Sequence, residues 1–256
     1  MQTIQWSVQP ESDGGPSKNA LLALQLAGAA AKNFDTSFLV VNKEREKSVP
    51  LFHAEEVVLG TRAIRTCGYF SEFELRSVRI IMDLAHGALN SASEETRRRF
   101  SERSIDGHYA VKYLQDGILD SDHGVNAACD MIVETKILMN LAPHPHISQI
   151  YGVNTGGIDS FLESGRMGFF IITDKIGETL VDRLQRWERS LHGRDQDVES
   201  SAYKTIETQF SERLELAMDI ASALVYLHDR QLVFNVRPDK IGFDARYGRT
   251  CAWSRS

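Results

Sequence analysis

The sequence has few cysteines, and the ones it has form neither a pair nor a cluster. Cys67, Cys129 and Cys251 are spread along a chain of 256 residues. An odd number of scattered cysteines excludes a disulfide framework, and the spacing lacks the paired cysteines of a zinc site. We therefore expect a reducing compartment and a cytoplasmic localisation.

Long hydrophobic runs are also missing. The apolar run near the start, residues 19–31, is too short to span a bilayer and is interrupted by Gln25. A signal peptide needs positive charge before such a run, and only Lys18 supplies any. We expect a short surface helix here and no membrane partner.

No strong excess of charge of either sign is present. The chain has 29 basic and 35 acidic residues, a net charge of −6, so no global field recruits nucleic acid or anionic lipid. Its 42% apolar and 25% charged residues are typical of a soluble globular protein, and its length suffices for one or two domains.

The apolar spacing that is present predicts a mixture of strands and helices. Residues 1–18, which contain Pro10, Gly14, Gly15 and Pro16, are expected to be disordered. We expect strands at 57–59, 109–114, 146–153 and 167–174, helices at 124–141, 179–189 and 210–230, and a polar loop at 192–208. The last helix is expected to bury one apolar face, formed by Leu214, Ala217, Ile220, Ala221, Leu224 and Leu227.

Two charged residues lie in apolar surroundings. Lys112 ends the apolar strand segment Tyr109-Ala-Val-Lys112, and Glu134 lies within the predicted helix 124–141. Taken alone, such a lysine is more often an exposed residue of an edge strand, and such a glutamate is more often a surface charge. Three further segments favour a different interpretation; these are Thr66–Phe73, Phe169–Ile176 and Tyr226–Asp244.

Five segments resemble, in family order along the chain, the motifs of a eukaryotic protein kinase of the Ser/Thr type, over residues 55–244. They are Thr66–Phe73, Tyr109–Lys112, Glu134–Ile147, Phe169–Ile176 and Tyr226–Asp244. The resemblance implies an α+β fold. A small antiparallel N-terminal lobe with five strands would be followed by the first part of a helical C-terminal lobe. The implied organisation is an extension at 1–54, partly disordered, an N-terminal lobe at 55–173 with an insertion at 76–108, the start of the C-terminal lobe at 174–244, and a tail at 245–256.

The resemblance also implies roles for residues of the N-terminal lobe. Lys112 would bridge the α- and β-phosphates of ATP, and Glu134 would orient its flexible ammonium, so the two should form an ion pair between strand and helix. Ala110 would pack on adenine. Gly68 would belong to the glycine-rich loop that cradles phosphate, in which only this one of three glycines remains.

The segment Phe169–Ile176 is similar to the strand and hinge that hold adenine. The resemblance makes Thr173 the gatekeeper. It assigns the adenine hydrogen bonds to the main chain of Asp174 and Ile176.

The catalytic-loop segment departs from the family. Asn235 replaces the aspartate base, Arg237 replaces the loop lysine, and Lys240 replaces the magnesium-binding asparagine. An amide cannot take a proton from a hydroxyl, and Lys240 puts a positive charge where a divalent cation would bind. The sequence also contains no Asp-Phe-Gly. We therefore expect weak ATP binding and no complete Mg²⁺ site, so no metal ligands are assigned.

Three functions stay open. The residues favour a pseudokinase-like module that binds ATP, or a protein partner, without turnover. The family favours a Ser/Thr protein kinase, active if the missing part of the C-terminal lobe is present in the true gene product. The third alternative is a non-functional truncated fragment.

Overall fold

A computed structural model describes residues 17–34, 49–67, 73–80, 89, 94, 97–98, 109–115, 117–162, 168–192, 199–233, 235–244 and 250–252. These residues have an α+β fold, as predicted, and form two compact units. Unit 1 contains the elements up to Lys175 except the turn 143–148, and unit 2 contains that turn and the elements from Ile176 onward. The expected disorder of 1–18 falls, except for its last two residues, outside the described residues.

A six-stranded sheet forms the centre of unit 1, with the strand order β1-β5-β6-β4-β3-β2. Five neighbouring strands are antiparallel, as predicted, but β1 pairs with β5 in parallel, so the prediction of a five-stranded, purely antiparallel sheet is wrong. The strands are β1 Leu51–Phe52, β2 Val57–Cys67, β3 Phe73–Ile80, β4 Tyr109–Leu114, β5 Ile150–Asn154 and β6 Phe170–Asp174. β5 begins four residues later than the strand predicted from His146.

Strand β4 lies between β3 and β6 and is buried along its whole length. Because successive side chains of a strand point to opposite faces, β4 contributes to two different environments. One face carries Tyr109, Val111 and Tyr113, and the other carries Ala110, Lys112 and Leu114.

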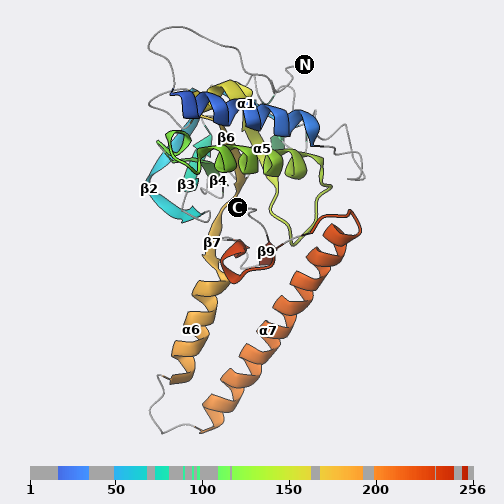
Figure 1. The fold of residues 1–256 in the computed structure, drawn as a ribbon. Helices are drawn as coiled ribbons and strands as arrows, with labels where there is room; N and C mark the ends of the chain where they lie inside the picture. Colours follow the sequence, from blue (N-terminus) through green and yellow to red (C-terminus); the bar gives the residue numbers. More distant parts are fainter. Residues whose placement is uncertain are drawn as a thin grey trace. The chain divides into compact units, whose positions relative to one another are not determined.

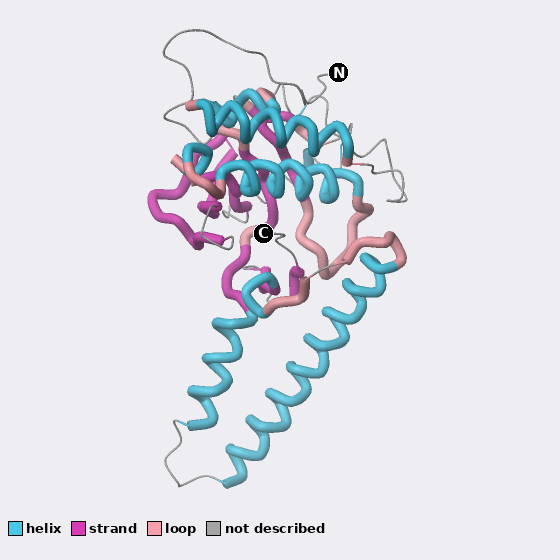
Figure 2. Tube along the Cα trace, in the orientation of Figure 1, coloured by secondary structure: helices cyan, strands magenta, loops and turns pink. Residues whose placement is uncertain are grey.

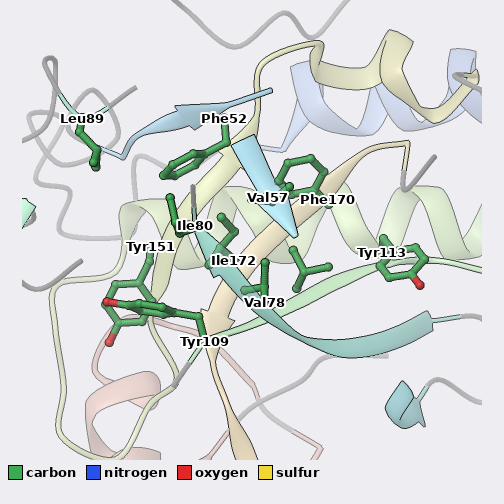
Figure 3. Packing of buried hydrophobic residues seen from close by; sticks show 11 residues of the cluster. Phe52, Val57, Val78, Ile80, Leu89, Tyr109, Tyr113, Tyr151, Phe170 and Ile172 are labelled. Carbon is green, nitrogen blue, oxygen red and sulfur yellow. The ribbon is translucent and has the colours of Figure 1, made fainter. Parts of the chain in front are cut away.

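The first of these faces is covered by an apolar cluster (Figure 3). Tyr109 and Tyr151 meet edge to face, with ring centroids 5.0 Å apart. The buried members of the cluster are Phe52, Val57, Val78, Ile80, Leu89, Tyr109, Val111, Tyr113, Tyr151, Phe170 and Ile172. Burial of this many large side chains makes β4 and β6 a rigid support for residues on the other face.

Two helices of unit 1, α1 Lys18–Asn33 and α5 Gly124–Asn140, lie side by side (Figure 1). The α1 helix confirms the helix expected at 19–31, and α5 confirms the helix expected at 124–141. Gly124 lets α5 start against the preceding turn, because a Cβ there would lie 2.6 Å from the carbonyl oxygens of Ile118 and Leu119. No helix of the described residues is long and apolar enough to cross a membrane.

Unit 2 combines a three-stranded antiparallel sheet with two long helices (Figure 2). Its strands are β7 Ile176–Thr179, β8 Ile241–Asp244 and β9 Thr250–Ala252, and its helices are α6 Leu180–His192 and α7 Glu199–His228. Short 3₁₀ turns occupy Ala54–Glu56, Ile118–Asp120 and Gly157–Leu162 in unit 1 and Pro238–Lys240 in unit 2. The loop predicted at 192–208 is wrong from Glu199 onward, where α7 begins.

The buried face predicted for α7 is confirmed only in part. Leu216 and Ile220 pack with Trp187 of α6 and with Ile241 and Phe243 of β8. Of the predicted face, Leu227 is buried and Ile220 and Leu224 are partly buried. Leu214, Ala217 and Ala221 are exposed. The helix has a second apolar stripe, and the sequence pattern alone does not tell which stripe is covered.

Candidate functional site

Lys112 and Glu134 form a buried ion pair between β4 and α5. The Lys112 Nζ donates to Glu134 Oε2 over 2.7 Å, and both side chains are 3% exposed. The expected ion pair between these residues is therefore confirmed. The pair joins positions 22 residues apart in sequence, so the sheet and the helix must both be in place before it forms.

The position of each partner follows from its element. Lys112 points away from the apolar cluster because it alternates with Val111 and Tyr113 along β4. Glu134 lies on the buried side of α5 together with Met131, Ile137 and Leu138. Charges are expensive to bury, and a close opposite charge only partly offsets that cost. A buried pair of this kind is therefore weak evidence of a net gain in stability.

Phe73 is a site residue that the sequence analysis did not identify. Its ring lies over the Lys112 ammonium, with Nζ 4.3 Å from the ring centroid, and its side chain is fully buried. Phe73 reaches this position because β3 pairs with β4, placing Phe73 opposite Leu114 and Leu75 opposite Lys112. The sequence feature that could have identified Phe73 is its position as an aromatic residue at the start of β3, the strand that pairs with β4.

Ala110 and Thr173 share the face of the sheet that carries Lys112. The two residues are direct partners in the β4–β6 ladder, and Lys112 is opposite Ile171 in the same ladder. Ala110 is fully buried and Thr173 nearly so. The structure thus brings three of the predicted ATP-binding residues, and Glu134, to one face of unit 1.

The Asp174 side chain holds the start of β5. Its Oδ1 accepts a hydrogen bond from the Tyr151 hydroxyl at 2.8 Å, and its Oδ2 accepts one from the Gln149 N–H at 3.0 Å. The predicted role concerned the Asp174 main chain, whose carbonyl oxygen accepts from the Thr173 hydroxyl at 3.4 Å. These contacts fix the backbone of the last residue of β6.

The predicted residues at the end of the hinge segment and in the catalytic-loop segment belong to unit 2. Ile176 begins β7, where it is opposite Asp244 of β8 and packs on Gly242. Asn235 is exposed, and Arg237 forms a two-pronged ion pair with Asp239, with N–O distances of 3.0 and 2.9 Å. Lys240 is buried at the start of β8.

Gly68 lies outside the described residues, in the connection between β2 and β3. Among the residues that the structure does describe, no group of three or more His, Cys, Asp or Glu side chains is arranged to hold a metal ion. The described part of the site therefore consists of the Lys112 ammonium, the Glu134 carboxylate that pairs with it, the Phe73 ring that covers it, and two small side chains on the same face. These two are Ala110 and Thr173.

The comparison with known proteins adds no relative to this picture. No protein-family model matches the sequence, and no curated protein is detectably similar to it.

Proposed function

We propose that this chain is a protein-kinase-like module that binds ATP through Lys112 and the main chain of Asp174, and that it does not transfer the phosphate. The observation that carries the proposal is the buried ion pair between Lys112 and Glu134. In the family that the sequence resembles, the lysine of this pair holds the α- and β-phosphates and the glutamate orients the lysine.

A structural role alone gives a weak account of the pair. Replacing a buried ion pair by apolar residues of similar size is often neutral or stabilising, so stability does not require these charges. A fixed ammonium on a rigid strand is, in contrast, suited to a polyphosphate, because the cost of orienting the lysine is met before the ligand arrives.

Ala110 and Thr173 support the same function. Both are small, and both lie on the Lys112 face of the sheet beside the segment that leads to Asp174. Small side chains suit close contact with an aromatic base, and a strand end offers main-chain donors and acceptors for its edge.

The unit 2 loop supports binding without turnover. The amide of Asn235 accepts hydrogen bonds but does not act as a general base at neutral pH. Lys240 adds a positive charge at the position where the resemblance would put a magnesium ligand. We therefore expect ATP binding that depends little on magnesium.

The test is an equilibrium titration with ATP, with and without Mg²⁺, followed by calorimetry. We expect a dissociation constant on the order of 0.1–1 mM, about 4–5.5 kcal/mol, that Mg²⁺ changes little. The double variant Lys112→Met with Glu134→Gln removes both charges together and should bind at least about ten-fold more weakly.

Lys32→Met is the matched control, because Lys32 is an exposed lysine of α1 in the same unit. It should bind ATP like the unaltered protein. Unchanged binding by the double variant, with circular dichroism showing that it is folded, would contradict the proposal.

A further inference from the structure

Helix α7 carries an apolar stripe that no described residue of unit 2 covers. Phe210, Leu214, Met218 and Val225 are between 53% and 66% exposed. Ala217 and Ala221, which are also exposed, complete the stripe. At 100° per residue these six positions lie on one side of the helix, over about 22 Å of its length.

The other sides of α7 are occupied. Leu216, Ala223 and Leu227 are buried on one of them. On another, the turn 143–148 packs against the helix: His146 Nε2 lies 3.3 Å from Asp219 Oδ1, and the His144 ring lies 4.7 Å from the Tyr226 ring. The exposed stripe is therefore a separate, third face and not the edge of the existing core.

The order of residues in the stripe is self-complementary. Its midpoint lies between Ala217 and Met218, and two antiparallel copies centred there bring large residues opposite smaller ones. The layers formed would be Phe210 with Val225, Leu214 with Ala221, and Met218 with Ala217, each occurring twice. Large residues against small ones is the arrangement by which antiparallel helices interdigitate.

The polar residues at the two ends of the stripe agree with this pairing, because an imidazole N–H can donate a hydrogen bond to a carboxylate. Glu207 precedes the stripe and His228 follows it, and both are exposed. In the centred antiparallel arrangement, Glu207 of one copy is opposite His228 of the other. A parallel arrangement would instead place Glu207 opposite Glu207, so the ends favour the antiparallel one.

We propose that the exposed face of α7 is a self-association surface, by which two copies of this chain pair antiparallel through Phe210, Leu214, Ala217, Met218, Ala221 and Val225. A closed two-fold pair uses the same patch on both copies and leaves no apolar stripe exposed. The partner is therefore a second copy of this chain. The proposal is independent of ATP binding.

Sedimentation equilibrium over a concentration series tests the pairing. We expect a monomer–dimer equilibrium, because one helix pair makes an interface at the small end of the range for stable complexes. Met218→Glu should raise the dissociation constant by roughly a hundred-fold or more, since it buries a carboxylate without a partner. Leu184→Glu is the control: Leu184 is an exposed leucine of α6 and should leave the dimer unchanged.

Charge reversal and cross-linking test the direction. Glu207→Lys should weaken the dimer, and the double variant Glu207→Lys with His228→Glu should restore it. A mixture of a Leu214→Cys chain and an Ala221→Cys chain should form a disulfide-linked heterodimer on oxidation, beyond what the unaltered chain forms. A chain that stays monomeric at every concentration, a Met218→Glu variant that still dimerises, or equal disruption by Leu184→Glu would overturn the proposal and leave the face to a different partner.

Discussion

The two ion pairs at the candidate site residues have similar lengths and opposite surroundings. Lys112 and Glu134 are 2.7 Å apart and 3% exposed, whereas Arg237 and Asp239 are 2.9 Å apart and more than 40% exposed. The first pair joins a strand to a helix, and the second joins two residues of one turn. Distance alone therefore says little about what an ion pair does.

Burial distinguishes the two pairs in free energy. Taking Lys112 and Glu134 out of water costs free energy, which their mutual attraction only partly offsets. Arg237 and Asp239 remain in water, where an ion pair is screened and contributes little.

The largest effect is on stability. Lys112→Met leaves the Glu134 carboxylate buried alone and should lower the free energy of unfolding by about 3–5 kcal/mol. Arg237→Met breaks the exposed pair and should lower it by less than about 1 kcal/mol. Urea unfolding followed by circular dichroism measures both.

A second variant shows whether the lost stability comes from the unpaired charge. Lys112→Met with Glu134→Leu removes both charges and should recover most of the loss, because no charge then remains buried. Equal losses for Lys112→Met and Arg237→Met would mean that the two pairs do not differ as their burial indicates.

The next effect is a dependence of unit 1 on alkaline pH. Burial, together with the hydrogen bond from its hydroxyl to Glu74, raises the pKa of Tyr113 to about 12. Above pH 10 the unfolded chain ionises Tyr113 while the folded chain does not. The protonated hydroxyl therefore contributes its full stabilisation below pH 10. As the pH rises from 10 to 12, the free energy of unfolding should fall by at most about 2–3 kcal/mol. Tyr113→Phe should remove that part of the loss in pH-dependent unfolding.

Unit 2 should respond to acid. Burial, and then the nearby His146 and Arg230, lower the pKa of His144 below its usual value. The neutral imidazole is thus favoured in the folded state. Its contribution to the free energy of unfolding is therefore fully present above about pH 6.5 and is lost as the pH falls below that value. His144→Asn should flatten this acid limb, and an unchanged limb would exclude His144 as its source.

A smaller effect concerns Phe73, whose ring covers the Lys112 ammonium. A polyphosphate must approach the same ammonium, so the ring competes with the ligand. Phe73→Val should therefore increase ATP affinity about five-fold, about 1 kcal/mol, despite a loss of stability. Phe170→Val is the matched control, because Phe170 is equally buried on the opposite face of the sheet and should not raise affinity. Lower affinity in Phe73→Val would make the ring part of the binding surface instead.

The smallest expected effect is on phosphotransfer. Asn235→Asp with Lys240→Asn restores two residues of the catalytic loop, and a general base contributes about 10²–10⁴ in rate. The double variant still lacks an Asp-Phe-Gly aspartate, so we expect activity at background in an assay with radiolabelled ATP and generic protein substrates. Clear turnover would show that another acidic residue, such as Asp244, completes a metal site, and the non-catalytic interpretation would then be wrong.

Local patterns predicted the central elements well. A short apolar strand at 109–114 and a helical period ended by Pro143 gave β4 and α5 within a residue of their ends. The contact between Lys112 and Glu134 followed from the order of the family-like segments, because it joins two elements far apart in sequence.

Other features depend on contacts that no local pattern contains. β1 has two residues and exists because β5 pairs with it. The Asp174 carboxylate is fixed by Tyr151 and Gln149, and Phe73 reaches Lys112 through the β3–β4 ladder. Helix α7 has two apolar stripes, and only tertiary packing decides which one is buried.

Labelling with an acyl-phosphate derivative of ATP tests the central claim most directly. In this reagent a lysine amine that lies beside the bound phosphates attacks the acyl carbon, keeps the acyl group as an amide and releases ATP. Digestion and mass spectrometry then locate the modified lysine. We expect Lys112 to be labelled in preference to the exposed Lys32, and we expect free ATP to suppress the labelling of Lys112. Labelling spread evenly over exposed lysines, or labelling of Lys112 that excess ATP does not suppress, would contradict the proposed function.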